Sequence, residues 1–395
     1  MNDQLVLHVI DSLGMVGGAE QQLVANLRRF ADLRLRHALA VVYEDTAGSR
    51  SSEVPDEVPI HLLYQGGARP SGRWDLVRSF DGAVTEIRPH LIHGSLANAG
   101  LAARLVGMRR RIPVVESLVN ISHESVRVTD NPGVTRLKLE GHRLLDRITM
   151  RTVTRFQALT PAVAESWERV VGLRPDRIEV IPRGIDLAEL DAGGSRSEAR
   201  QSILSELGLA DDAFVVLAVG RVEPQKGHRY LIEAMPAILE QVSGAVLLVA
   251  GRPGASSPMV ESLIEQLGLA DRVMLLGRRS DVPRLLGAAD VFVFPSLFEG
   301  LGVSLLQAMG RALPVVTTNR RPMSDVVDDG TTGVLVPAED PAAIAEMVTR
   351  LFADPAERNR LGAAARQEVA GEYDADEVAA RVERFYLRAL DERGS

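Results

Sequence analysis

A strand, a glycine loop, a helix and a second strand follow one another within residues 289–319, which read ADVFVFPSLFEGLGVSLLQAMGRALPVVTTN. The apolar run 291–294 is short and bounded by turn-forming residues, which is typical of a buried parallel strand. Gly300 and Gly302 allow the loop backbone to approach a ligand closely. Because the N-terminus of the following helix presents free N–H groups, this unit predicts a site for a ligand that carries phosphate.

Two polar residues in the same stretch narrow the class of ligand. Glu299 lies in the loop, where a carboxylate would repel a bare phosphate but accept hydrogen bonds from hydroxyl groups. Gln307 lies eight positions later, on the helix, where it can face the same crevice and reach a ribose. A sugar nucleotide, with phosphates at one end and hydroxyls at the other, suits both residues. The alternative is that Glu299 only caps the helix and that Gln307 is solvated.

A second strand end, in residues 214–227 (FVVLAVGRVEPQKG), carries two cations, Arg221 and Lys226. Only two of the 45 basic residues are lysines, so the bias of the chain would place arginine at position 226. A lysine there indicates that a compact point charge is needed. Ligands bind at the carboxyl ends of strands in open α/β sheets, so the two cations are predicted to hold a diphosphate. The alternative is a pair of solvated surface charges.

Strands and helices alternate along the whole chain, which predicts parallel sheets with helices on both faces. The first set begins with a strand at 5–10 and the second with a strand at 214–219. Residues 183–212 between the two sets are polar and contain glycine, and they are interpreted as the linker region. A length of 395 residues agrees with this division. We therefore predict an α/β protein with two Rossmann-like domains.

The two cations and the glutamate loop form an ordered motif: G-R-x-x-x-x-K at 220–226, then F-E-G-x-G at 298–302. This set resembles the retaining glycosyltransferases of family 4, which have the GT-B fold. Such enzymes usually have glutamate where this chain has Gln307, and often asparagine where it has Arg183. The similarity covers nearly the whole chain and includes GGAE at 17–20, IPRGID at 181–186, GR at 251–252, VMLLG at 273–277 and DGTTGVLVP at 329–337.

The resemblance implies two domains that face each other across a cleft, with the last helix crossing back to the N-terminal domain. The implied domains are residues 1–190 with the helix 375–395, and residues 191–374. In the family, the C-terminal domain binds the donor, and the first glycine loop of the N-terminal domain faces the donor phosphates and borders the acceptor. The candidate catalytic residues are Arg221, Lys226 and Glu299. The candidate donor-binding residues are Gly17, Gly18, Gly220, Arg278, Gly300, Leu301, Gly302, Val303 and Gln307.

The acceptor side is less well defined by the resemblance. Family members commonly place a cleft histidine shortly after the strand that here reads PVV, at residues 113–115. The matching position holds a different residue, near Val119. Asn120 and His123 are the candidates for contacting the acceptor instead, although His123 is equally consistent with an ordinary loop histidine.

The implied reaction moves a sugar, with retention of configuration, from a UDP- or GDP-sugar to a glycan, lipid-linked or small-molecule acceptor, as in polysaccharide or glycoconjugate biosynthesis. One rival is a sugar-nucleotide epimerase or hydrolase. Another is a catalytically silent sugar-nucleotide-binding protein, which Gln307 and the missing histidine favour. A phosphorylase with pyridoxal phosphate is disfavoured because neither lysine has an evident cofactor pocket. We expect no cofactor and no metal, since the Asp-x-Asp sequence at 374–376 precedes a helix and is better explained by N-capping.

Charge is divided unevenly along the chain. Residues 1–190 contain 24 basic and 23 acidic side chains, net +1, and residues 191–395 contain 21 and 30, net −9, which gives the overall −8. Within a predicted helix at 134–155, four arginines recur every four residues and form one basic stripe: Arg143, Arg147, Arg151 and Arg155. The stripe is either a solvated helix face or a contact for anionic lipid. Few aromatic residues accompany it, so nucleic acid is not expected as a partner.

The chain has no cysteine, which excludes disulfides, thiolate catalysis and zinc–thiolate sites. Its first residues, MNDQLVLHVI, lack the basic and apolar regions of a signal peptide. No apolar run approaches the length of a membrane-spanning helix. We therefore expect a cytoplasmic protein, with peripheral contact at the inner membrane face if the arginine stripe binds lipid.

Overall fold

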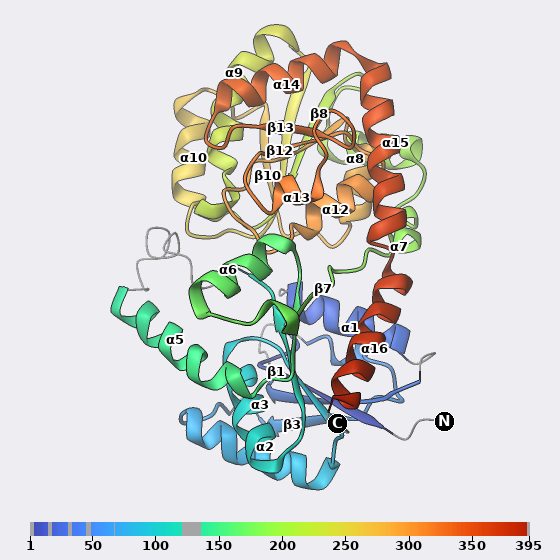
Figure 1. The fold of residues 1–395 in the computed structure, drawn as a ribbon. Helices are drawn as coiled ribbons and strands as arrows, with labels where there is room; N and C mark the ends of the chain where they lie inside the picture. The colour runs from blue at the N-terminus through green and yellow to red at the C-terminus, as the bar shows by residue number, and fades with distance from the viewer. Residues whose placement is uncertain are drawn as a thin grey trace. The chain divides into compact units, whose positions relative to one another are not determined.

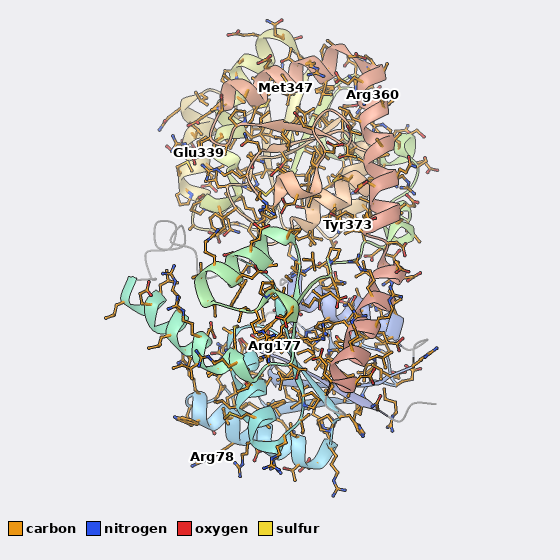
Figure 2. The ribbon with its side chains drawn as sticks, in the orientation of Figure 1. Arg78, Arg177, Glu339, Met347, Arg360 and Tyr373 are labelled. Atoms are coloured by element: carbon orange, nitrogen blue, oxygen red, sulfur yellow. The ribbon has the colours of Figure 1, made fainter. Side chains whose placement is uncertain are left out.

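The computed structural model describes residues 4–14, 18–30, 34–44, 49–66, 68–120 and 136–392. The chain divides into two compact units (Figure 1). The first unit is Met1–Gly184 together with Ala375–Ser395, and the second is Ile185–Asp374. Tyr373, at the C-terminal end of the last helix of the second unit, marks where the chain returns to the first (Figure 2).

The first unit contains a seven-stranded parallel sheet with the order β3-β2-β1-β4-β5-β6-β7. Its strands are β1 (Leu5–Ile10), β2 (Arg36–Tyr43), β3 (Ile60–Tyr64), β4 (Leu91–Gly94), β5 (Val114–Leu118), β6 (Arg155–Ala158) and β7 (Ile178–Val180). Its helices are α1 (Gly18–Phe30), α2 (Arg73–Ile87), α3 (Ala97–Arg110), α5 (Arg136–Thr149), α6 (Pro161–Val171) and α16 (Ala375–Asp391).

Helices cover both faces of this sheet because successive side chains of each strand point to opposite faces. In β1, Leu7 and Val9 join one apolar core, which also contains Phe80 of α2. Val6 and Ile10 join the other core, with residues of α1 and α16. The closing helix α16 therefore packs on the first unit, against α1 and beside β4 and β5.

The second unit contains a six-stranded parallel sheet with the order β10-β9-β8-β11-β12-β13. Its strands are β8 (Phe214–Val219), β9 (Ala245–Ala250), β10 (Val273–Gly277), β11 (Val291–Phe294), β12 (Val315–Thr318) and β13 (Val334–Val336). Its helices are α7 (Leu187–Asp191), α8 (Arg196–Leu207), α9 (His228–Gln241), α10 (Ser257–Gln266), α11 (Val282–Ala288), α12 (Val303–Gly310), α13 (Met323–Val326), α14 (Pro341–Ala353) and α15 (Pro355–Glu372).

Both sheets reverse their strand order beside the first strand of the unit. In the first unit β1 lies between β2 and β4, and in the second unit β8 lies between β9 and β11. Such a reversal leaves a crevice at the carboxyl ends of the two strands, where ligands bind in open α/β sheets. The candidate residues that follow β8 and β11 are therefore placed at a ligand-binding position by the topology alone.

The interpretation of residues 183–212 as a linker is wrong, because they contain two helices of the second unit. α8 begins with a capping box in which Ser195 and Glu198 bond each other's backbone N–H groups. α7 packs on α11 and α12, and Asp191 pairs with Arg366 of α15 at 2.7 Å. The compact units consequently divide after Gly184 rather than at residue 190.

The predicted helix at 134–155 ends earlier than expected. α5 stops at Thr149, a short 3-10 turn covers Met150–Thr152, and Arg155 is the first residue of β6. The four arginines therefore do not form one helical stripe. Within the described part of the chain, no helix combines the length and apolar character needed to cross a membrane.

Candidate active site

Where the strand order of the second sheet reverses, the loop after β8 meets the loop after β11, although the two loops are far apart in the sequence. The backbone N–H of Leu297, after β11, donates to the carbonyl of Gln225, after β8, at 2.8 Å. Gly227 has a φ of +64°, and a Cβ at this position would overlap the carbonyl oxygen of Pro295. Glycine is therefore required at residue 227 both by its backbone conformation and by the close approach of the other loop.

Lys226 and Glu299 form an ion pair at the centre of these loops. The Lys226 Nζ lies 2.5 Å from Glu299 Oε1, and the two side chains are only 15% and 10% exposed. Ser296 Oγ donates to the same carboxylate oxygen at 2.9 Å, and the Lys226 Nζ lies 5.4 Å from the centroid of the Phe294 ring. The ammonium group has three N–H donors, so a pair with one carboxylate oxygen leaves donors for a phosphate.

Arg221 is arranged differently from Lys226. Its side chain is 46% exposed, and its Nη1 donates to Glu223 Oε1 at 3.2 Å. The other Glu223 oxygen accepts from the backbone N–H of Ala255 at 3.2 Å. Next to Arg221, the loop after β8 touches the loop after β9. This contact requires glycine at residue 251, because a Cβ there would overlap the carbonyl oxygen of Gly220. The predicted cations thus both follow β8, where Lys226 is half-buried and Arg221 is exposed.

The N-terminus of α12 lies in the same crevice as the ion pair. Its N-cap residue, Gly302, has a φ of +81° and no side chain that could cap the helix. The N–H groups of the first turn can therefore meet an anion. Ser304 Oγ donates to the carbonyl of Val219 at 3.0 Å, which ties this turn to the end of β8.

The remaining donor-side candidates lie around this turn or on the neighbouring strand. Leu301 is buried beneath the loop, and Val303 is half-buried at the start of α12. Gln307, one helical turn after Val303, is also half-buried. Arg278 is exposed and follows β10, the edge strand two positions from β8. Gly18 is the first residue of α1 in the first unit, and Gly17 lies outside the described residues.

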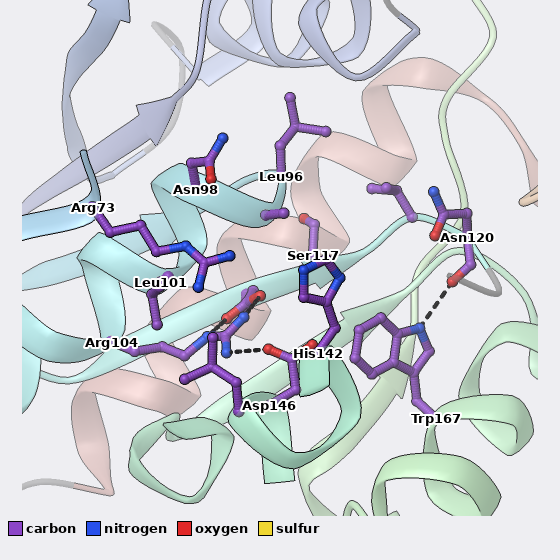
Figure 3. A pocket seen from close by; sticks show the side chains of 14 residues that line it. Arg73, Leu96, Asn98, Leu101, Arg104, Ser117, Asn120, His142, Asp146 and Trp167 are labelled. Atoms are coloured by element: carbon purple, nitrogen blue, oxygen red, sulfur yellow. Dashed lines mark hydrogen bonds and ion pairs between the residues drawn. The ribbon is translucent and has the colours of Figure 1, made fainter. Parts of the chain in front are cut away.

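The first unit has its own cavity, of about 360 Å³, at the carboxyl ends of β4 and β5 (Figure 3). Asn120 lines it, and its backbone carbonyl accepts from the indole N–H of Trp167 at 2.9 Å. His123, the other acceptor-side candidate, lies outside the described residues. Arg73 and His142, which the sequence analysis did not select, are exposed side chains directed into the cavity in Figure 3.

A buried ion network forms the floor of this cavity. Arg104 on α3 donates to both carboxylate oxygens of Glu116 on β5, at 2.7 and 2.8 Å. Its Nη1 also donates to Asp146 and to the Thr149 hydroxyl on α5, each at 2.6 Å. Burial alone would lower the pKa of Arg104, but the two carboxylates raise it above its ordinary value. The network therefore stays charged and ties three elements together.

The sequence contains a signal for this network. Glu116 interrupts the apolar strand PVVESL, and Arg104 interrupts a helix of small and apolar residues. Charged residues in such places are rarely buried unless they are paired. Gly100 supports the pair, because a Cβ there would lie 2.9 Å from Glu116 Oε1.

Among the described residues, no group of three or more histidine, aspartate or glutamate side chains is arranged so that it could hold a metal ion. Asp376 of the Asp-x-Asp sequence pairs with Arg29 of α1 at 2.7 Å.

Comparisons with known proteins agree with the geometry. The family model "Glycosyltransferase Family 4" matches residues 16–189, and the model "Glycosyl transferases group 1" matches residues 199–368. A D-inositol 3-phosphate glycosyltransferase of Salinispora arenicola is 35% identical over 353 residues, which cover 84% of this chain and 73% of that protein. An uncharacterized glycosyltransferase of Methanocaldococcus jannaschii is 33% identical over 221 residues, 55% of this chain and 56% of that protein.

The fold is also similar to that of solved structures. The structure of Anabaena HepE in complex with UDP and glucose has a TM-score of 0.81 with this chain at 20% identity, covering 98% of this chain and 100% of that one. The predicted fold class and family are both confirmed. The chain belongs to family 4 of the glycosyltransferases and has their GT-B fold.

Proposed function

We propose that the second unit binds a nucleotide-sugar at the reversal point of its sheet, and that the enzyme transfers the sugar with retention of configuration. The observation that carries the proposal is the half-buried Lys226–Glu299 pair beside the uncapped N-terminus of α12. This arrangement offers cationic and N–H donors for the diphosphate and a carboxylate for sugar hydroxyls. Gln307 lies one turn into the same helix and would contact the ribose.

The chemical step follows from the charges. As the bond between the anomeric carbon and the phosphate oxygen breaks, negative charge grows on the leaving diphosphate. Lys226 and Arg221, together with the N–H groups of α12, would stabilise that charge more strongly than they stabilise the bound donor. The acceptor oxygen forms its bond on the face that the diphosphate leaves, and the acceptor proton passes to the leaving phosphate oxygen. No protein base is needed for this step.

The donor is proposed to be a UDP- or GDP-sugar. HepE, which has the same fold, was solved with UDP and glucose, and this favours UDP among the two. Gln307 stands where the family usually has glutamate, and it would bind the ribose more weakly than glutamate does, because an amide oxygen is a weaker acceptor than a carboxylate. The nucleotide-sugar is the substrate, and no further cofactor is proposed.

The acceptor is proposed to bind the cavity of the first unit. Arg73 and His142 enter it from exposed positions, and neither has a carboxylate partner within the described residues. An acceptor that carries hydroxyls together with an anionic group would suit these side chains. The relatives named D-inositol 3-phosphate glycosyltransferase fit that class. A glycan or a lipid-linked sugar with a phosphate remains a second candidate of the same chemistry.

A two-stage experiment tests the proposal. Thermal shifts with UDP-, GDP- and ADP-sugars would identify the donor, since a ligand that binds only the folded state raises the melting temperature. Turnover of that donor is then measured with and without acceptors, and the anomeric configuration of the product is read by NMR. Transfer with retention supports the proposal. Donor hydrolysis or epimerisation without acceptor supports the epimerase or hydrolase alternative, and binding without turnover supports a silent binding protein.

A further inference from the structure

Helix α5 turns part of its apolar surface outward. Leu137, Leu144 and Ile148 are 84%, 60% and 61% exposed, although their spacing places them on one face of the helix. The face turned toward the unit carries Asp146 and Thr149, which bond Arg104. Asp146 and Thr149 thus turn toward the buried arginine, on the side of α5 that also buries Leu139, and three large aliphatic side chains are left in solvent. An apolar face of this kind on an exposed helix needs a partner.

A hollow of about 480 Å³ opens at the C-terminal end of the same helix. Four arginines from α5 and the segments that follow it line the hollow, namely Arg147, Arg151, Arg174 and Arg177. Figure 2 labels Arg177, just before β7. The lining also includes three apolar core residues, Met150, Phe156 and Val171. A wall of arginines above an apolar floor suits a phosphate ester that carries an organic group.

Most of this positive charge is not neutralised within the described residues. Arg174 pairs with Asp176 at 3.0 and 2.6 Å. Arg147 donates to the backbone carbonyl of Val170 at 2.8 Å, and Arg177 donates to two backbone carbonyls at 3.4 Å. Backbone carbonyls orient a guanidinium but carry no net charge. Arg147, Arg151 and Arg177 therefore remain available for an anion.

We propose that the outward face of α5 and the arginine hollow form one docking surface for a bilayer that contains anionic phospholipid. The headgroup phosphate would be held by Arg147, Arg151 and Arg177, while Leu144 and Ile148 enter the apolar boundary of the bilayer. Two independent features of one surface support this occupant: the charge of the arginines is complementary to phosphate, and the aliphatic face of α5 is complementary to acyl chains. The inference is independent of the proposed donor and acceptor.

This surface differs from the arginine stripe expected from the sequence. Arg143 pairs with Glu140 at 2.5 Å on α5, and Arg155 on β6 pairs with Glu392. Those two arginines are already neutralised. The contact would instead use Arg177, which is 26 residues after Arg151 in the sequence but donates to its carbonyl.

The test is cosedimentation of the full chain with vesicles. Wild type is expected to sediment with mixed phosphatidylcholine–phosphatidylglycerol vesicles at low salt, to be released at high salt and to ignore pure phosphatidylcholine. The triple variant R147Q/R151Q/R177Q should lose affinity by about fivefold for each arginine removed. The variant L144S/I148S should also bind more weakly and should show the same salt dependence as wild type.

Matched control variants remove side chains of the same kinds, arginine and a large apolar residue, at other positions of the first unit. R78Q/R88Q/R111Q takes three exposed arginines, and M108S takes an exposed methionine of α3; both should leave vesicle binding within about twofold of wild type, because they lie outside the surface. Unchanged circular dichroism and melting of the triple variant would exclude unfolding as the cause of its loss.

Three results would overturn the proposal. The first is wild type that ignores anionic vesicles at low salt. The second is tight binding of glycerol phosphate or inorganic phosphate to the arginines without vesicle binding, which would make the hollow a site for a soluble anion. The third is a dimer, seen by sedimentation velocity, that L144S/I148S dissociates, because a second copy would then cover α5.

Discussion

The two units have the same sheet reversal beside their first strand, yet each contains a cation that is bonded in a different way. In the first unit, Arg104 is almost completely buried and donates hydrogen bonds to Glu116, Asp146 and Thr149. In the second unit, Lys226 contacts one carboxylate at the rim of the crevice and keeps donors available. A fully bonded charge holds elements together, whereas a charge with remaining donors can bind a ligand. The different roles proposed for Arg104 and Lys226 rest on this difference in bonding.

The two units also differ in buried histidine. His8, His37 and His93 lie together beneath α16, where His8 Nε2 lies 3.0 Å from His37 Nδ1 and His93 Nδ1 lies 2.7 Å from the Tyr386 hydroxyl. The second unit has one comparable residue, His228. Burial lowers the pKa of His8 well below 6.5, of His37 to about 3, of His93 to about 4 and of His228 to about 4.

This difference predicts that acid destabilises the first unit more steeply than the second. Below pH 6.5 and down to pH 4, the unfolded chain binds protons that the folded histidines do not, so the free energy of unfolding falls as the pH falls. Each buried histidine contributes a slope of about 1.4 kcal/mol per pH unit, so three should outweigh one. Calorimetry between pH 7 and pH 5 measures this, with a nucleotide-sugar used to identify the second unit's transition. Equal slopes for the two transitions would contradict it.

The Arg104 network predicts the largest effect of a single substitution. R104M should lower the free energy of unfolding of the first unit by about 3–5 kcal/mol, because it leaves the buried Glu116 carboxylate without its partner. The double variant R104M/E116Q should recover part of that loss. On the same helix, R110M removes an exposed arginine that pairs with Asp81 at 2.7 Å and should cost less than about 1 kcal/mol. Urea denaturation compares the three. A mild R104M would mean that the network does not hold these elements together.

Lys226 should show the opposite pattern, with a large loss of activity and little loss of stability. K226A is expected to reduce turnover by about 10²–10³-fold, as for a lost donor to a developing oxyanion. R229A is the matched control, because Arg229 is exposed, pairs with Glu233 at 3.0 Å and lies on the adjoining helix α9. Steady-state kinetics with the identified donor decide the matter. Near-normal turnover in a folded K226A protein would remove Lys226 from the diphosphate site.

Much of this arrangement was predictable because backbone pattern determines it. Short apolar runs bounded by glycine and proline located the strands of the second sheet, and the confirmed fold class followed from their alternation with helices. The pairing of Lys226 with Glu299 brings together two motifs that the sequence had identified separately. Lysine was informative at this position because all but one of the other basic residues of the chain are arginines.

The parts that could not be predicted depend on long-range charge. Helical periodicity assumes that the apolar face of a helix turns inward. In α5 that assumption holds for the buried Leu139 but fails for Leu144 and Ile148, because the inward side also provides Asp146 and Thr149 as polar partners for Arg104. The end of α5 was also missed, since the arginine spacing continues through a 3-10 turn into β6. A four-residue repeat alone cannot distinguish one helix from a helix followed by a strand.

Gln307 provides the smallest and most specific prediction about the crevice that is proposed to bind the donor. It is half-buried on α12, one turn beyond the uncapped N-terminus, and it stands where the family usually has glutamate. A carboxylate accepts hydrogen bonds from ribose hydroxyls more strongly than an amide does, by about 1 kcal/mol. Q307E should therefore keep donor affinity or improve it up to about tenfold, with stability unchanged because the side chain is partly solvated. Isothermal titration with the nucleotide-sugar measures this, and Q307A is the control that removes both groups. If Q307E binds as weakly as Q307A or more weakly, the amide N–H is the group that the donor needs, and Gln307 contacts an acceptor atom of the ligand rather than the ribose hydroxyls.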